Sequence, residues 1–256
     1  MMHRIDLNCD LGESFGVYTF GQDEQIFPLI SSANIACGFH AGDPQVMRRS
    51  VAMAVKHRVA IGAHPGIPDL AGFGRRGLGL TLEEFENILI YQVGALDAFA
   101  RAAGTRIHHV KLHGWWYNKA ARDRDLSIAI ARTVKALNPE WILFGLSGSK
   151  IIHAAKEIGV KCAEEAFIDR TYQPDGHLSN RELQGSVILD PELAVQQCLK
   201  IVLEGKVRAT NNTEIPLHAD TLCIHGDNPQ VLPILSLVRQ RLEENEIKVE
   251  AFLLNN

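Results

Sequence analysis

The chain has 256 residues, of which 46% are hydrophobic and 22% charged, and its formal net charge at pH 7 is −4. This is an ordinary globular composition with enough apolar residues for a substantial core, and the length suits one large α/β domain. Because lysines and arginines form no runs and the net charge is negative, the composition argues against a partner that is nucleic acid or an anionic membrane.

The start of the chain and its cysteines indicate in which cellular compartment the protein is expected. Residues 3–8 already follow a strand pattern, with no signal-peptide pattern before them, and no apolar run approaches the length of a membrane span. The five cysteines are odd in number and widely spaced, without a C-x-x-C pair. That pattern is typical of buried thiols in a reducing compartment. We therefore expect a cytoplasmic protein.

Strand-like and helix-like segments alternate along the whole chain. Strands are expected at 3–8, 33–37, 59–63, 107–112, 141–146, 161–167 and 221–224, and a last strand is left open at 247–252. Helices are expected at 23–30, 44–55, 81–103, 126–137, 149–158, 190–205 and 228–244. Two helix starts carry clear signals, the Asp43-Pro44 pair and the capping box from Thr81 to Glu84. Asn211-Asn212 between short β-prone segments predicts a small hairpin insertion near 207–217.

This alternation predicts a single domain over residues 1–256. Repeated β-α units at roughly 25–35 residue spacing imply parallel strands with right-handed crossovers. A doubly wound sheet would also satisfy the pattern. We favour an irregular, seven-stranded TIM-like (β/α) barrel, because all of its strand ends face one crevice.

Four histidines occupy equivalent places, after an apolar segment and within two residues of a glycine: His40, His64, His113 and His225. A single histidine there is more often a structural group. Four at strand ends predict a shared pocket, in which imidazoles serve as proton shuttles, as donors that polarise a carbonyl, or as metal ligands.

Acidic and basic residues accompany these histidines. Asp10 ends the first strand and is a candidate general base or metal ligand, although an Asx-turn would explain it equally well. Lys111 alternates with Val110 and Leu112, so its side chain is expected at the interior mouth of the barrel, where it can contact a carboxylate or phosphate.

Two glycine-containing segments resemble nucleotide motifs and are rejected as such. Residues 72–77 match G-x-G-x-x-G but follow a proline-containing loop instead of a strand, so a loop whose Arg75 or Arg76 binds an anion is the better interpretation. Residues 145–150 lack the spacing of a phosphate loop. Since the chain also lacks H-E-x-x-H or another tight ligand spacing, we expect no tightly bound metal.

Taken together, the motifs resemble the LamB/YcsF lactam-utilisation family. The resemblance extends in order over nearly the whole chain, through residues 6–13, 32–43, 62–66, 72–76, 111–114, 117–118, 169–170, 175–176 and 223–227. It implies a barrel related to those of glycoside hydrolases and carbohydrate deacetylases. It also implies ATP-coupled opening of 5-oxoproline to L-glutamate, with ATP as co-substrate and companion subunits B and C, and it leaves a homo-oligomer open. This chain departs from the family pattern at Leu112, Trp115 and Trp116, and again between 179 and 187.

Specific roles follow as hypotheses. The catalytic candidates are Asp10, His64, Lys111 and His113, with Asp10 and one of the two histidines as the acid–base pair. The substrate-binding candidates are Asn8, Glu13, His40, Asp43, Arg75, Tyr117, Asn118, Asp169, Arg170, His225 and Asp227. Two alternatives stay open: a metal-dependent amide or N-acetyl hydrolase of the deacetylase type, and a non-catalytic small-molecule binding subunit.

Overall fold

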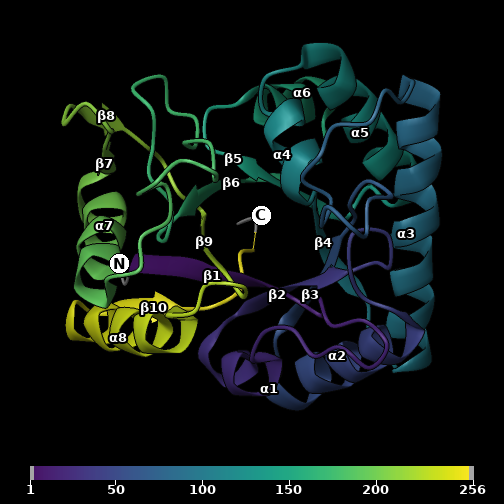
Figure 1. Cartoon of the computed structure of the whole chain (residues 1–256), viewed down its shortest axis with the longest axis horizontal. Coiled ribbons are helices and arrows are strands. Elements are labelled where there is room, and N and C mark those ends of the chain that lie inside the picture. Colours follow the sequence, from purple (N-terminus) through teal and green to yellow (C-terminus); the bar gives the residue numbers. More distant parts are fainter. Residues whose placement is uncertain (1–2, 254–256) are drawn as a thin grey trace.

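Residues 3–253 of the chain are described by a computed structural model, in which parallel strands close into a barrel surrounded by helices (Figure 1). The barrel strands are β1 (His3–Leu11), β2 (Ser32–Ala36), β3 (Ala60–His64), β4 (Ile107–Lys111), β5 (Ile142–Leu146), β6 (Cys162–Phe167) and β9 (Thr221–His225). They pair in that order, and β9 also pairs with β1, which closes the barrel. The predicted seven-stranded TIM-like barrel is confirmed; residues 1–2 and 254–256, at the ends of the predicted domain, lie outside the described residues.

The helices lie around the outside of the barrel (Figure 1). They are α1 (Asp23–Ile26), the 3-10 helix η1 (Phe27–Leu29), α2 (Pro44–His57), α3 (Leu82–Ala102), α4 (Gly114–Ala120), α5 (Arg124–Leu137), α6 (Lys150–Ile158), α7 (Pro191–Glu204) and α8 (Val231–Glu244). In α3, Leu89, Val93 and Leu96 recur at helical spacing and are fully buried, which fixes the face that it turns to the core. Among residues 3–253, no helix combines the length and apolar character that crossing a bilayer requires.

The helix signals in the sequence are mostly confirmed, with two corrections. Thr81 forms the predicted capping box with Glu84 at the start of α3. Helix α4 was not predicted, because a glycine and three aromatics have low helix propensity; it forms where Trp116 and Tyr117 can be buried. Helix α8 begins at Val231, three residues later than the predicted start at 228; the side chain of Asn228 donates to Asp169 and accepts from the N–H of Gln230.

Two small elements complete the fold. Strands β7 (Lys206–Arg208) and β8 (Glu214–Pro216) pair antiparallel, in the region where the sequence predicts a hairpin. Strand β10 (Ile247–Val249), shorter than the segment considered in the sequence, pairs with the first residues of β1. Beyond it, Phe252 packs against the buried residues Ile142, Phe144 and Ala163.

The barrel contains one irregular pairing, between β3 and β4. The register shifts between Ile61 and Gly62. A Cβ atom at Gly62 would overlap the ring of His109, so only glycine leaves room for that imidazole inside the barrel. The Nε2 atom of His109 lies 2.7 Å from Oδ1 of Asn34, which makes this close approach part of the buried polar network.

A buried carboxyl in β1 makes stability depend on pH. Asp6 accepts hydrogen bonds from Ser31, Ser32 and Thr221, and burial nevertheless raises its pKa from 3.8 to about 6. Because the folded state holds this proton more tightly than the unfolded state, stability is greatest below pH 4 for this group and falls as pH rises towards 6. The shift corresponds to a loss on the order of 3 kcal/mol.

We expect Asp6→Asn to remove this part of the pH dependence. Denaturant unfolding between pH 4 and pH 7 should show a shallower decline in the free energy of unfolding for the variant than for the wild type. Asp125→Asn, which removes an exposed carboxyl from α5, is the matched control and should leave the slope unchanged. Parallel curves for Asp6→Asn and the wild type would contradict the assignment.

Candidate active site

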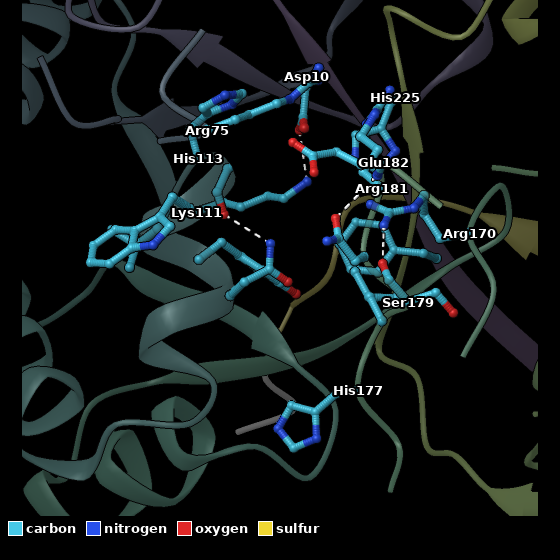
Figure 2. A pocket seen from close by; sticks show the side chains of 18 of the residues that line it. Asp10, Arg75, Lys111, His113, Arg170, His177, Ser179, Arg181, Glu182 and His225 are labelled. Carbon is cyan, nitrogen blue, oxygen red and sulfur yellow. Dashed lines mark hydrogen bonds and ion pairs between the residues drawn. The ribbon is translucent and has the colours of Figure 1, made fainter. Parts of the chain in front are cut away.

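The carboxyl ends of the barrel strands bring the predicted polar residues together. The pairing register sets Asp10 beside both Asn34 and His225, and sets Ala36 beside His64. A cavity of about 640 Å³ opens at this end (Figure 2). The predicted site residues that line it are Asp10, His64, Arg75, Lys111, His113, Tyr117, Asn118, Arg170 and His225.

A buried ion pair lies at the base of the cavity. Nζ of Lys111 is 2.7 Å from Oδ1 of Asp10, 3.1 Å from Oε1 of Glu165 and 3.0 Å from Sγ of Cys223. Burial alone would lower the pKa of Lys111, but the charges around it, with Asp10 foremost, hold that pKa well above its ordinary value. Burial alone would raise the pKa of Asp10, but His64 and Lys111 hold that pKa well below its ordinary value. The pair is therefore an ammonium and a carboxylate.

Amide side chains hold this ion pair in place. Nδ2 of Asn34 donates to Oδ1 of Asp10 at 2.8 Å and to Oδ1 of Asn8 at 2.7 Å. Nδ2 of Asn8 in turn donates to Oε1 of Glu165 at 2.9 Å. Asp10 and Lys111 thus have several partners each, which favours a rigid arrangement, while Oε2 of Glu165 is buried without a hydrogen-bond partner among the described residues.

A second pair consists of His225, the last residue of β9, and Asp169. Nδ1 of His225 is 3.0 Å from Oδ1 of Asp169, and the backbone N–H of His225 also donates to that carboxylate. Burial would raise the pKa of Asp169, but His225 and the hydrogen bonds lower it, so Asp169 is ionised. With Nδ1–H bonded to Asp169, Nε2 is the ring nitrogen of His225 left for the cavity that this residue lines.

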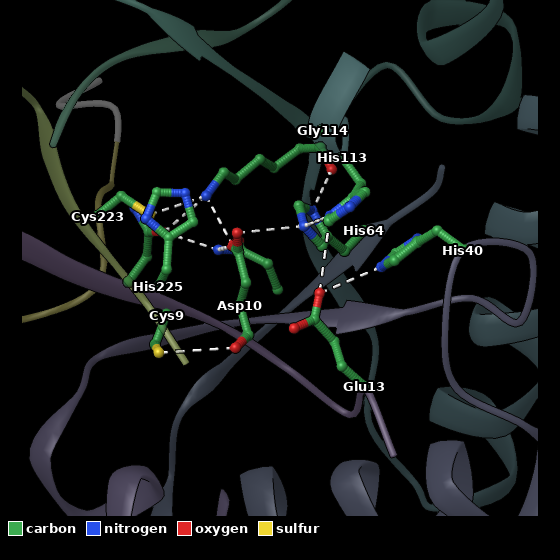
Figure 3. Close-up of polar contacts among 12 residues, drawn as sticks. Cys9, Asp10, Glu13, His40, His64, His113, Gly114, Cys223 and His225 are labelled. Atoms are coloured by element: carbon green, nitrogen blue, oxygen red, sulfur yellow. Dashed lines mark hydrogen bonds and ion pairs between the residues drawn. The ribbon is translucent and has the colours of Figure 1, made fainter. Parts of the chain in front are cut away.

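The other three strand-end histidines form a compact group with Glu13 (Figure 3). The rings of His40 and His113 stack with centroids 3.6 Å apart, and His64 meets His113 edge-on. Potential ligand atoms of Glu13, His40, His64 and His113 all lie within 4.8 Å of one another. Burial lowers the pKa of His40 and of His113 well below the ordinary value. His64 and His113 line the cavity, whereas Glu13 and His40 lie behind them.

The loop between β3 and α3 covers this group and reaches across the cavity mouth. The carbonyl of Phe73 accepts from Nε2 of His113 at 2.8 Å. Arg75 then pairs with Asp227 at 2.6 Å, and Arg181 from the loop after β6 pairs with the other oxygen of Asp227 at 2.5 Å. Asp227 therefore connects two loops at the rim of the cavity. Burial would raise the pKa of Asp227, but the neighbouring His225 and the two arginines lower it to about 2, so this group is a carboxylate.

Gly74 lets this loop approach the histidines. Its φ is +63°, and a Cβ atom there would lie 2.7 Å from Cβ of His40 and 2.9 Å from Cδ2 of His113. We expect Gly74→Ala to destabilise the fold by about 1–3 kcal/mol through backbone strain and overpacking. Gly79→Ala in the same loop, where the added Cβ meets nothing within 4 Å, is the control. Equal unfolding midpoints in urea for the two variants would contradict this explanation.

The remaining predicted residues lie off the cavity surface. Asp43 is the N-cap of α2, accepting from the N–H groups of Gln45 and Val46, and is not brought to the cavity. Asn8, Glu13, His40 and Asp169 lie buried behind lining residues, and Asp227 lies at the rim.

Sequence reasoning missed several residues that the fold brings to this place. Glu165 is fully buried in β6 and contacts Lys111; its signal was a pair of adjacent glutamates, Glu164 and Glu165, in a short strand whose other residues are apolar. Asn34 carried a similar signal within β2. Arg122, Arg181 and Glu182 also line the cavity, but they come from loops, where a charged residue carries no such signal.

The cavity lining is cationic although the chain as a whole is acidic. Its basic residues are Arg75, Lys111, Arg122, Arg170 and Arg181. The carboxylates in the lining are those of Asp10 and Glu182. Four of the basic side chains are paired with carboxylates, Lys111 with Asp10 and Glu165, Arg75 and Arg181 with Asp227, and Arg122 with Asp175. Arg170 instead donates to the backbone carbonyls of Ser179 and Ser186, so its positive charge favours an anionic ligand.

The chain matches known proteins over nearly its full length, so the matched region includes every residue of the candidate site. Residues 5–255 match the model of the LamB/YcsF family. A protein of Bacillus licheniformis, named as the A subunit of 5-oxoprolinase, is 53% identical over 251 residues, covering 98% of this chain and 99% of its own length. One of the same name from Tolumonas auensis is 50% identical over 250 residues, covering 98% and 100%.

Solved structures give the same result. The lactam utilization protein of Thermus thermophilus superposes with a TM-score of 0.91 at 47% identity, over 97% of this chain and all of that one. A protein of Enterococcus faecalis superposes with a TM-score of 0.61 at 14% identity, over 98% of each chain, and shares the fold. The full-length match and the high identity show that this chain belongs to the LamB/YcsF family.

Proposed function

We propose that this chain is the A subunit of an ATP-dependent 5-oxoprolinase, which opens the lactam ring of 5-oxoproline to give L-glutamate, with ATP converted to ADP and phosphate. The observation that carries the proposal is the full-length similarity to relatives that bear the name of this subunit, at 53% identity for the Bacillus licheniformis protein. The cavity supports it, because one concave site holds a fixed ammonium, a His–Asp pair and several arginines.

The charges of the cavity suit the substrate. 5-Oxoproline carries one carboxylate, and the partner we propose for it is Arg170, which is held in place by the carbonyls of Ser179 and Ser186. The Lys111 ammonium lies deeper and is suited to stabilise negative charge that develops on the lactam oxygen. A lactam is a stable amide, so its carbonyl must be polarised or its oxygen phosphorylated before water attacks.

The proton needed for cleavage of the C–N bond has a candidate source in His225. The sequence hypothesis placed acid–base chemistry on Asp10 with His64 or His113. The structure does bring Asp10 and His64 together, with Oδ2 of Asp10 3.3 Å from Nε2 of His64. Both ring nitrogens of His64 are engaged, however, because Nδ1 lies 2.8 Å from the carbonyl of Lys111 and Nε2 faces Asp10 and His113. We favour His225 instead, because Asp169 fixes its ring through Nδ1 and leaves Nε2 to serve the cavity. Asp169 would then orient the imidazole and would not itself transfer a proton.

ATP and the partner subunits belong to the same proposal. A small lactam fills only part of a cavity of about 640 Å³, so the phosphates of a nucleotide could share its arginine-lined mouth. We propose that companion subunits B and C supply the rest of the nucleotide site. We place the reaction in the cytoplasm, because all five cysteines are free thiols.

The decisive experiment is an assay of glutamate release from 5-oxoproline, with and without ATP, using this chain alone and with subunits B and C added. ATP-dependent release in the complete mixture supports the proposal. Acetate release from an N-acetylated sugar by the isolated chain would indicate a deacetylase. Binding of 5-oxoproline without turnover in the complete mixture would indicate that this chain only binds the ligand.

A further inference from the structure

We propose that Glu13, His40, His64 and His113 form a binding site for one divalent transition-metal ion of the Zn²⁺ type (Figure 3). The sequence argued against a metal because these residues are far apart along the chain. That argument fails in the folded protein, since the ends of β1, β2, β3 and β4 bring one ligand each to the same place. The proposal stands independently of the lactam reaction.

Hydrogen bonds to backbone carbonyls fix which nitrogens of two rings carry protons. Nδ1 of His64 lies 2.8 Å from the carbonyl oxygen of Lys111, and Nε2 of His113 lies 2.8 Å from that of Phe73. A carbonyl oxygen only accepts, so these nitrogens are the donors. In neutral rings, the lone pairs are then on Nε2 of His64 and Nδ1 of His113.

These two lone pairs face each other. Nε2 of His64 and Nδ1 of His113 are 3.0 Å apart, and Oε1 of Glu13 lies 3.7 Å from Nδ1 of His113. Oδ2 of Asp10 also lies 3.3 Å from Nε2 of His64. Such a group of acceptors is repulsive unless a cation lies among them, either a proton on Nε2 of His64 or a metal ion, and we propose the metal ion. Nε2 of His40, 3.2 Å from Oε1 of Glu13, adds a further potential ligand atom to the group.

The spacing fits a metal ion. With bonds of about 2.0–2.2 Å, ligand atoms around a tetrahedral Zn²⁺ lie roughly 3.3–3.6 Å apart. The separations of 3.0, 3.2 and 3.7 Å among the facing atoms bracket that range. Three imidazoles with one carboxylate are a ligand set that suits Zn²⁺ and its neighbours in the first transition row.

The surroundings have the form that metal-binding histidines require. In metal sites the second ring nitrogen of a histidine ligand donates to a carboxylate or a backbone carbonyl, which fixes the ring orientation. His64 and His113 both do this, through the carbonyls of Lys111 and Phe73. Because these two histidines also line the cavity, an ion held by the group would border the space in which a substrate binds.

The test measures metal binding directly, without a substrate. The full chain is purified without chelators, and its metal content is determined by elemental analysis. The chain is then stripped of metal and titrated with Co²⁺ while visible absorption is recorded. We expect one metal ion per chain and the intense bands of four-coordinate Co²⁺.

Variants identify the ligands. Glu13→Gln and His40→Ala should lose stoichiometric Co²⁺ binding, whereas His225→Ala, which removes an imidazole of the same cavity outside the group, should bind as the wild type does. Far-UV circular dichroism checks that each variant is folded. If a ligand variant does not fold, the wild-type spectrum decides, because the weak bands of six-coordinate Co²⁺ or less than stoichiometric binding would overturn the proposal. Unchanged binding by folded Glu13→Gln and His40→Ala would overturn it as well.

Discussion

Replacing Lys111 by methionine should destabilise the protein by about 3–5 kcal/mol, because removal of one partner leaves a buried charge uncompensated. The lysine side chain is 2% exposed, and the carboxylates of Asp10 and Glu165 lie within 3.1 Å of its Nζ atom. Methionine conserves most of the volume, so the lost charge accounts for the effect. Urea unfolding of the isolated chain measures it.

A second substitution separates charge from packing. In the Lys111→Met background, Glu165→Gln removes one of the two carboxylates left without the ammonium and should recover part of the lost free energy of unfolding. Lys161→Met is the matched control, since that lysine is 39% exposed and pairs with Glu140 at the surface; its cost should stay below about 1 kcal/mol. A cost for Lys111→Met as small as that of Lys161→Met, or no recovery in the double variant, would contradict the role of the ion pair.

The sequence predicted the barrel because its strands leave a strong local signal. Each barrel strand contains buried apolar residues, even where polar residues such as Asn8, Asn34 and Lys111 alternate with them. The order of elements alone fits both a closed barrel and an open sheet, and the barrel was favoured because its strand ends face one crevice. Closure depends on the pairing of β9 with β1, more than two hundred residues apart, and no local pattern records such a contact.

The candidate site was predictable in its position and much less so in its connections. Strand-end residues such as His64 and His225 were found because parallel strands bring their carboxyl ends together. Which of them touch depends on register and side-chain rotamer. In the motif of residues 32–43, for example, Asp43 caps a helix and His40 is buried behind the cavity. The contact between Asp169 and His225 could not be predicted, because the two residues are far apart in the sequence.

The same distinction explains why the sequence predicts no metal site while the fold leads us to propose one. Tight spacing within one helix is the familiar sign of a metal site, because helical neighbours point in one direction. In a barrel, the ligands can come singly from successive strand ends, at intervals set by the lengths of the βα units. Glu13, His40, His64 and His113 are separated in this way and converge only when the sheet closes.

Asp169→Asn should lower kcat for glutamate release by about 10²–10⁴-fold if His225 transfers the proton to the lactam nitrogen. The neutral amide no longer stabilises a positively charged imidazole, and it can present an N–H group where the carboxylate accepted one. The ring of His225 would then lose the orientation and the tautomer that leave Nε2 available. Because Asp169 lies behind His225 and off the cavity surface, KM for 5-oxoproline should change little.

Asp227→Asn is the contrasting variant. It removes a carboxylate that lies two residues after His225 in the sequence and that pairs with the rim arginines Arg75 and Arg181. Loosening these loops should raise KM while kcat falls much less. The steady-state assay uses the chain with its companion subunits, ATP and varied 5-oxoproline, and thermal unfolding confirms that both variants are folded. If Asp169→Asn and Asp227→Asn affected kcat equally, proton transfer would have to be assigned elsewhere. An unaltered kcat in His225→Gln would remove this histidine from the chemistry altogether.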